Sequence, residues 1–203
     1  MSSSLSLQYP LILASNSPRR KEILSQAGFD FSILPADIDE SIDATWPIEE
    51  VPGILAEKKA KVLATACPNQ LILAADTIVV VDGQILNKPA DKQEAREMLL
   101  LLSGKDHEVY TGISLIGPGG INTQVDRAIV SFRDLLDWEI EWYVKGGSSL
   151  DKAGAYGVQD FIGMVGISRL EGSFYTVMGL PIHRVYHMMQ PYILEGRQSI
   201  LPF

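Results

Sequence analysis

The chain has 203 residues, of which 46% are apolar and 21% charged, and its formal net charge is −8 at pH 7. This composition is that of a folded globular protein, and it excludes intrinsic disorder and collagen-like repetition. The acidic balance argues against a general nucleic-acid-binding surface, which needs many cations to neutralise phosphates. The single cysteine, Cys67, excludes an internal disulfide and a cysteine metal cluster, and it fits a reducing compartment.

The sequence predicts a cytoplasmic protein without a membrane segment. The first residues carry no basic cluster, and the nearest apolar run, residues 11–14, is too short for the core of a signal peptide. Nothing approaches the roughly 18 consecutive apolar residues of a membrane-spanning helix. We therefore expect neither a membrane nor a nucleic-acid polymer as a partner.

Short apolar runs alternate with amphipathic stretches along the chain, a pattern typical of an α/β fold. The apolar runs that predict strands lie at residues 11–14, 29–34, 71–75, 78–81 and 84–86. A long hairpin is expected next, with strands at residues 107–116 and 121–132.

Helices are predicted from their capping residues. Pro18 suits the first turn of a helix, and Asp91 with Glu94 forms a capping box. Asp137 can cap a third helix, and Pro181 can begin a fourth that runs to about residue 190.

Residues 14–20 are the first candidate for a binding site. They join an apolar strand to a helix through small polar residues, with Arg19 and Arg20 directly after the proline. Such a turn directs free backbone N–H groups and the positive end of the helix dipole at one point, which suits a triphosphate. The alternative is a capped helix with two surface arginines.

Lys59 is unusual because it falls on the apolar face of a predicted helix. At 100° per residue, Leu55, Val62 and Ala66 share that face, and Lys59 lies between them. Its ammonium group must either extend to solvent or pair with a buried anion.

Asp76 ends an apolar strand, where ligands and catalytic groups gather in α/β sheets. Lys88 follows one hairpin later, and residues 37–40 add three acids, Asp37, Asp39 and Glu40. Carboxylates with nearby lysines and arginines suit magnesium-assisted phosphoryl chemistry. The alternative for the three acids is that they cap turns.

Two later segments are also candidates. Residues 151–159 are rich in glycine and end at Gln159, whose amide could read a base edge, although the segment could also be a surface loop. Residues 172–181 are interpreted as a turn, a strand and a second turn. The three histidines lack the spacing of a zinc site and are interpreted as structural.

Taken in order, five segments resemble the Maf family over about residues 10–192. They are residues 14–20, 75–79, 88–89, 151–159 and 179–181. The resemblance divides the chain into an N-terminal extension (1–9), a Maf-like pyrophosphatase domain (10–192) and a C-terminal tail (193–203). It implies an elongated mixed sheet with flanking helices, related to the inosine triphosphatase fold, with two lobes around a central cleft.

Maf proteins are nucleoside triphosphate pyrophosphatases historically linked to septum formation. The resemblance implies hydrolysis of a nucleoside triphosphate to a monophosphate and pyrophosphate, a divalent cation (Mg²⁺ or Mn²⁺) and a homodimer. Arg19, Thr77 and Gln159 match the branch that prefers dTTP and UTP. Residues 174–178 depart from the asparagine-containing form common in the family.

The resemblance also implies a role for each matching residue. Asp76 matches the catalytic proton acceptor, and Glu40 together with Asp76 matches the metal site. The residues that match phosphate-site positions are Ser15, Arg19, Arg20, Lys59 and Lys88. Two other functions stay open: a nucleotide-binding regulator of cell division without turnover, and a housecleaning enzyme for modified nucleotides.

Overall fold

The structure of the chain is a computed structural model that describes residues 4–194. Its framework is a seven-stranded mixed sheet in the order β2-β1-β3-β5-β6-β7, with β4 paired to β3. The strands are β1 (Leu11–Leu13), β2 (Ser32–Ile33), β3 (Leu71–Val81), β4 (Gln84–Leu86), β5 (Asp106–Gly117), β6 (Gly120–Phe132) and β7 (Ile167–Glu171). The predicted α/β class and the predicted mixed sheet with flanking helices are confirmed.

Seven α-helices and three short 3₁₀ turns complete the described part of the chain. The helices are α1 (Pro18–Gln26), α2 (Val51–Ala64), α3 (Lys92–Leu102), α4 (Asp137–Lys145), α5 (Phe161–Gly166), α6 (Phe174–Met178) and α7 (Ile182–Met189). The 3₁₀ turns are η1 (Ile48–Glu50), η2 (Ala153–Ala155) and η3 (Gln190–Tyr192). None of the described helices is long and apolar enough to cross a membrane.

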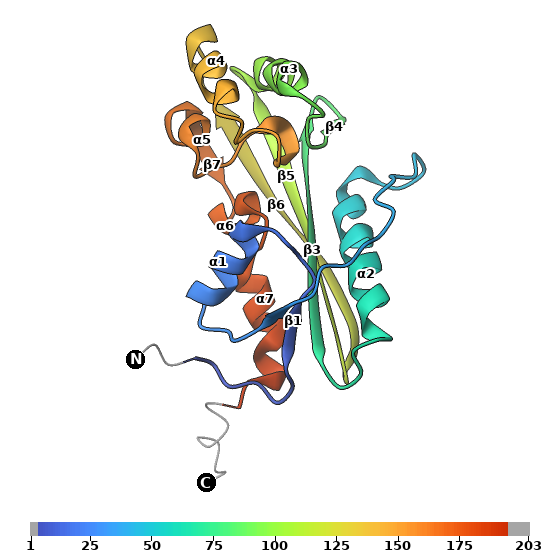
Figure 1. The fold of residues 1–203 in the computed structure, drawn as a ribbon. Coiled ribbons are helices and arrows are strands. Elements are labelled where there is room, and N and C mark those ends of the chain that lie inside the picture. The colour runs from blue at the N-terminus through green and yellow to red at the C-terminus, as the bar shows by residue number, and fades with distance from the viewer. Residues whose placement is uncertain (1–3, 195–203) are drawn as a thin grey trace.

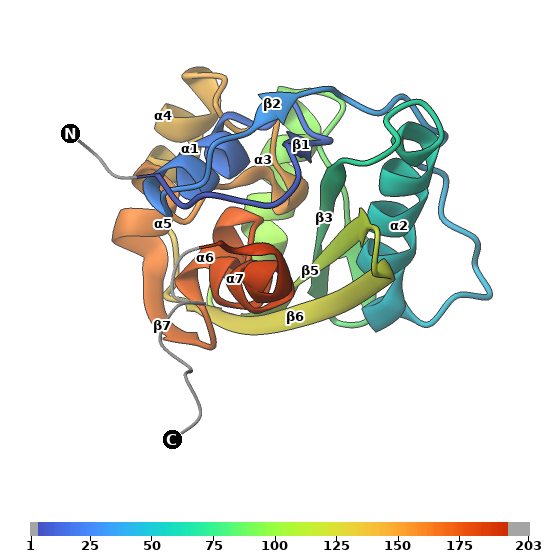
Figure 2. The ribbon, with the colours of Figure 1, turned by 90° about the horizontal axis from the view of Figure 1, so that it is seen from below.

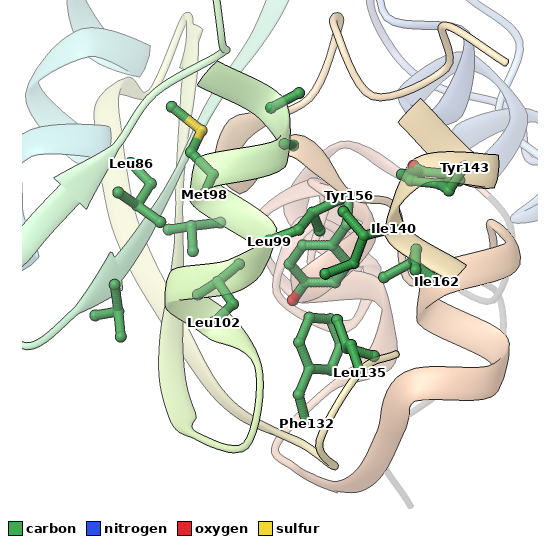
Figure 3. Packing of buried hydrophobic residues seen from close by; sticks show 14 of the residues in the cluster. Leu86, Met98, Leu99, Leu102, Phe132, Leu135, Ile140, Tyr143, Tyr156 and Ile162 are labelled. Carbon is green, nitrogen blue, oxygen red and sulfur yellow. The ribbon is translucent and has the colours of Figure 1, made fainter. Parts of the chain in front are cut away.

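The long strands β3, β5 and β6 form the spine of an elongated molecule (Figure 1). Helix α2 covers one face of the spine, and α6 and α7 lie on the other face (Figure 2). Helices α3, α4 and α5 gather at the far end of the strands, where an apolar cluster includes Leu99, Phe132, Ile140 and Tyr156 (Figure 3). A second cluster joins β1, α1 and α7 at the near end. Two lobes are thus built on one continuous sheet.

Several predicted elements form where the local signal is strongest. Helix α1 begins at Pro18, and its capping residue Ser17 accepts a hydrogen bond from the backbone N of Arg20. In α3 the carboxylate of Asp91 accepts from the N of Glu94, whose own carboxylate accepts from the N–H of residue 90. The predicted hairpin is confirmed as β5 and β6.

Other predictions are corrected. Residues 71–81 form one strand rather than two, and the strand expected at 29–34 is reduced to β2. Asp137 lies inside α4 instead of capping it, because the carboxylate of Glu139 accepts from the N of Leu136. Pro181 precedes α7 rather than starting it.

Two further corrections concern the surroundings of the cleft. Residues 174–178 are helix α6 and not a strand, since Ser173 caps the start and Gly179 ends the helix with a φ of 98°. On α2, Val62 is 52% exposed and Ala66 lies beyond the helix, so neither belongs to the apolar face around Lys59. That face is instead formed by the buried residues Leu55, Ala56, Ala60 and Leu63.

The described parts of the two terminal segments pair with each other and with the body of the fold. Leu7 forms an antiparallel bridge with Ile193, and Leu5 forms a parallel bridge with Phe29. The proposed division at residues 9 and 192 stays a prediction. Most of the expected tail, residues 195–203, lies outside the described residues.

Candidate active site

The candidate site lies along an open edge of β3. On this edge β1 pairs with residues 71–73 and β4 with residues 79–81, while β5 occupies the opposite edge. Residues 74–78 of this edge therefore pair with no strand among the described residues. Asp76 and Thr77, the residues singled out in the sequence, lie in this gap.

Two adjoining cavities of about 350 and 360 Å³ meet at this edge. The cavity beside α1 is lined by residues 14–20 and has a polar wall. The other extends toward the far lobe, and its wall combines charged residues with an apolar patch that includes Val79, Val109, Val158 and Val177. The residues common to both walls are Ser17, Arg19, Arg20, Glu40, Lys59, Lys88 and Asp151. This combination suits a ligand with an anionic end and a flat, less polar end.

At the junction, Lys59 links two carboxylates. Its Nζ lies 2.6 Å from Oδ1 of Asp76 and 2.6 Å from Oε1 of Glu40. The side chains of Lys59 and Asp76 are only 10% and 13% exposed, whereas that of Glu40 is 55% exposed. Lys59 therefore pairs with a buried anion rather than extending to solvent, because an unpaired charge at this depth would be costly.

The electrostatic surroundings keep Glu40 ionised. Burial alone would raise the pKa of Glu40, but the hydrogen bond and the charge of Lys59 outweigh burial and lower that pKa. Lys88 and Arg20 lower it further through their charges. The acids of the cleft thus sit within a cationic frame that can also receive phosphates.

Arg20 is held by the protein on several sides. Its Nε donates to the carbonyl of Gly179 at 2.8 Å, and its Nη1 donates to the carbonyl of Ala75 at 2.8 Å and to Oγ of Ser15 at 3.3 Å. Its Nη2 donates to Oγ1 of Thr77 at 3.1 Å. A guanidinium has five N–H donors, so one is left for a ligand. Arg20 mainly organises the open edge of β3.

Arg19, Ser15 and Lys88 are placed differently. Arg19 makes one ion pair, with Asp151 at 3.2 Å, and lines both cavities. Ser15 is buried and accepts from the backbone N of Ser17. Lys88 lines both cavities, so β4 and the chain after it return this lysine toward Asp76 as expected.

The structure separates the three acids of residues 37–40. Glu40 lines both cavities, whereas Asp37 and Asp39 line neither. The carboxylate of Asp39 accepts from the backbone N and the hydroxyl of Ser41, at 2.9 and 2.8 Å. Asp39 is therefore a turn-capping residue.

The glycine-rich segment 151–159 forms part of the wall of the cavity that extends toward the far lobe. Gly157 and Val158 line it, but Gln159 is exposed and is not among the lining residues. Tyr156 also lines the wall, and its hydroxyl contacts Nε2 of the buried His107 at 2.7 Å. The structure thus brings eight of the nine predicted site residues together at the two cavities, and it places Gln159 just outside.

Sequence reasoning did not single out Asp151, which lines both cavities, or two threonines that reach the site through Thr77. Asp151 pairs with Arg19, and its position inside the glycine-rich segment was the available signal. Thr111 and Thr176 are fully buried and connect to Thr77 by hydrogen bonds. They lie in a strand and a helix remote in sequence, and no local pattern marks them.

The donor set of the cleft fits a divalent cation that arrives with a phosphate ligand. No group of three or more His, Cys, Asp or Glu side chains among residues 4–194 could hold a metal alone. Glu40 and Asp76, however, both approach the same point, the ammonium group of Lys59. Magnesium is usually held by one or two carboxylates together with substrate phosphates. These two acids are therefore the residues that would hold the cation.

Comparison with known proteins agrees with this geometry. A family model described as Maf-like protein matches residues 10–192. A dTTP/UTP pyrophosphatase of Halalkalibacterium halodurans is 47% identical over 181 residues, which cover 89% of this chain and 95% of the relative. A dTTP/UTP pyrophosphatase of Phocaeicola vulgatus is 44% identical over 182 residues, covering 88% and 94%. Because the family model spans nearly the whole chain and both relatives align over most of it, the chain belongs to the Maf family.

Proposed function

We propose that the chain is a nucleoside triphosphate pyrophosphatase that hydrolyses dTTP and UTP to the monophosphate and pyrophosphate. One observation carries the proposal: Asp76, Lys59 and Glu40 meet where a cation-lined cavity beside α1 joins a second cavity that has an apolar patch on its wall. A triphosphate fits the first cavity and a nucleoside the second. The names of the relatives from Halalkalibacterium halodurans and Phocaeicola vulgatus support the same substrates.

In this proposal the basic side chains of the cleft bind and orient the triphosphate. Arg19, Lys59 and Lys88 neutralise its negative charge, and the start of α1 adds the positive end of its dipole. The hydrogen bonds of Arg20 to Ala75 and Thr77 fix the position of the strand edge beside which the ligand would bind. Positioning of this kind supplies much of the catalysis of phosphoryl transfer.

The chemical step takes place at the α-phosphorus. The oxygen of a water molecule forms a bond to this atom, and the bond to the bridging oxygen breaks, so pyrophosphate leaves with the electron pair. Asp76 has one of two roles. It accepts the proton of the attacking water, or it holds the cation together with Glu40 while bulk water accepts that proton. When bound, Mg²⁺ or Mn²⁺ would supply positive charge at the phosphates. A homodimer and a cytoplasmic location complete the proposal and rest on the family resemblance and the composition.

A panel of triphosphates with pyrophosphate detection tests the function. UTP and dTTP should give a higher kcat/KM than ATP and GTP, and excess chelator should abolish turnover until magnesium or manganese is restored. Binding of UTP with no turnover at any metal concentration would contradict the proposal and favour a nucleotide-binding regulator. A modified nucleotide far ahead of UTP would favour a housecleaning enzyme.

A further inference from the structure

A buried hydrogen-bond chain begins at Thr77 and leads away from the cleft. Oγ1 of Thr77 lies 3.0 Å from Oγ1 of Thr111, and Oγ1 of Thr111 donates to the carbonyl of Thr176 at 2.8 Å. Thr111 and Thr176 are both fully buried. Thr77 and Thr111 are opposed across β3 and β5, which explains their close approach.

The number of hydrogens fixes the direction of this chain. Each threonine hydroxyl has one hydrogen and two lone pairs, and a carbonyl oxygen can only accept. The hydrogen of Thr111 is used on the carbonyl of Thr176, so the hydrogen between Thr77 and Thr111 must come from Thr77. The reverse direction would leave the contact to Thr176 without a hydrogen, and buried polar groups are rarely left in that state.

The remaining capacity of the Thr77 hydroxyl is then determined. Its hydrogen is directed at Thr111, and one lone pair accepts from Nη2 of Arg20 at 3.1 Å. One lone pair is left. Space beside this oxygen exists because residue 179 is glycine: a Cβ there would lie only 3.1 Å from Oγ1 of Thr77. Toward the cleft, the hydroxyl of Thr77 can accept a hydrogen bond but cannot donate one.

The far end of the chain is anchored by a buried carboxylate. Oγ1 of Thr176 donates to Oδ2 of Asp126 at 2.5 Å, and Nε of Arg184 donates to Oδ1 of the same acid at 2.5 Å. Asp126 is 7% exposed. These bonds fix helix α6, and with it the carbonyl that takes the hydrogen of Thr111. The bond between Thr176 and Asp126 is buried, whereas the side chain of Arg184 is 41% exposed.

We infer that Thr111 and Thr176 are positioning residues that make Thr77 an acceptor for the N3–H group of a uracil or thymine ring. Thr77 lines the cavity that extends toward the far lobe, together with Val79, the next residue on the same face of β3. Uracil and thymine carry a hydrogen on N3, whereas N3 of cytosine is an acceptor. An acceptor that faces an acceptor leaves two polar groups unpaired. This inference rests on the proposed function.

Two nucleotide probes test it on the unmodified protein. UTP methylated at N3 and CTP should each show a kcat/KM at least about tenfold below that of UTP, the size expected for a lost hydrogen bond with an unpaired partner. Methylation adds bulk, but CTP does not, so agreement between the two probes separates polarity from size. N3-methyl-UTP or CTP within about twofold of UTP would overturn the inference.

Variants of Thr111 test the positioning role. Thr111→Val removes the acceptor that holds the hydrogen of Thr77, so the ratio of kcat/KM for UTP to that for CTP should fall severalfold. Thr111→Ser retains the hydroxyl and should restore the ratio of the unmodified protein. An equal ratio in the valine variant and the unmodified protein would overturn the inference while UTP hydrolysis stands. Failure of the unmodified protein to hydrolyse UTP at all would instead contradict the proposed function.

Discussion

At the scale of single residues, Asp76 is the position in the cleft where we expect a substitution to reduce catalysis most. It combines a nearly buried carboxylate with one ion-pair partner, Lys59, and a place on the open edge of β3. Asp76→Asn keeps the shape of the side chain but removes a base and a charge. We expect kcat to fall by about 10² or more, the usual effect of losing a general base. Binding of UTP, measured by calorimetry, should persist because less negative charge then faces the phosphates.

The matched control for this prediction is Asp39→Asn. Asp39 lies in the same region of sequence as Glu40 but caps its own turn and does not line the cleft. Its replacement should leave kcat close to that of the unmodified protein. If Asp76→Asn retained more than about half of the original kcat, the base or ligand would have to lie elsewhere.

The two neighbouring arginines should respond differently to the same substitution. Arg20→Lys cannot reproduce the bonds to Gly179, Ala75 and Thr77 at once, because lysine lacks the planar fork. We expect a loss of about 2 kcal/mol or more in the free energy of unfolding, together with lower activity. Arg19→Lys keeps a charge at the cavity wall and should raise KM with little change in stability. Urea denaturation and steady-state kinetics of both variants measure this contrast, and equal stabilities would contradict it.

The sequence identified the residues that carry charge at the site but not those that orient them. Asp76 and Lys59 were found because a charge in an apolar strand or on an apolar helix face conflicts with its surroundings. Glu40 was found as one of three acids just after a predicted strand and by its match to the Maf metal site. Thr111 and Thr176 create no such conflict, because threonine is uncharged and carries only one hydroxyl. Their role depends on contacts between residues 34 and 65 positions apart, which a local pattern does not record.

At the scale of elements, the site depends on how closely α2 approaches the sheet. Gly112 of β5 is opposite Asp76, and a Cβ at this position would overlap the backbone of Pro52 and Gly53 at the start of α2. The absence of a side chain lets α2 lie directly on the sheet. That contact brings Lys59 within reach of Asp76.

Gly112→Ala should therefore be strongly destabilising. We expect a loss of about 2 kcal/mol or more in the free energy of unfolding, because backbone atoms cannot move aside as a flexible side chain can. Gly146→Ala is the control, since Gly146 has an ordinary φ of −65° at the end of α4 and its Cβ would meet only one backbone oxygen, at 3.3 Å. Thermal melts of both variants should separate them clearly. Similar midpoints would show that the contact between α2 and β5 is not tight.

Elements with a complete local signal were predicted, and elements fixed by distant contacts were not. The caps of α1 and α3 lie within four residues of each helix start, so they can be identified from the sequence. Helix α6 has only five residues and was mistaken for a strand, because Phe, Tyr, Thr and Val favour strands. Its helical state depends on the cap at Ser173, the left-handed Gly179 and the buried bond from Thr176 to Asp126.

At the scale of the whole molecule, His107 joins the far lobe to the wall of the cleft. It is 1% exposed, contacts the ring of Phe132 and the hydroxyl of Tyr156, and its Nδ1 has no partner among the described residues. Burial lowers its pKa to about 4, while the charge of Asp106 opposes the shift. The neutral ring is therefore part of the folded state.

This shift makes stability depend on pH in a defined direction. An unfolded histidine binds a proton near its ordinary pKa of about 6.5, whereas folded His107 does so only near pH 4. Between pH 6.5 and pH 4 the unfolded state binds more protons at this residue than the folded state does. The stability that neutral His107 contributes is therefore fully present above pH 6.5 and is lost as the pH falls through about 4. His107→Gln, which can still bond to Tyr156, should flatten the free energy of unfolding between pH 7 and 4.5. Parallel curves for the two proteins would show that His107 is not neutral and buried.

In the whole molecule, a cavity beside α1 joins a cavity that extends toward the far lobe, and the carboxylates of Glu40 and Asp76 lie where the two cavities meet. The proposed mechanism requires that water attacks the α-phosphorus of a nucleoside triphosphate bound across this junction. The most direct measurement is hydrolysis of UTP in ¹⁸O-labelled water, followed by mass spectrometry of both products. Attack at the α-phosphorus should give UMP that carries the label, together with unlabelled pyrophosphate. Label in the pyrophosphate, or release of UDP and phosphate, would contradict it.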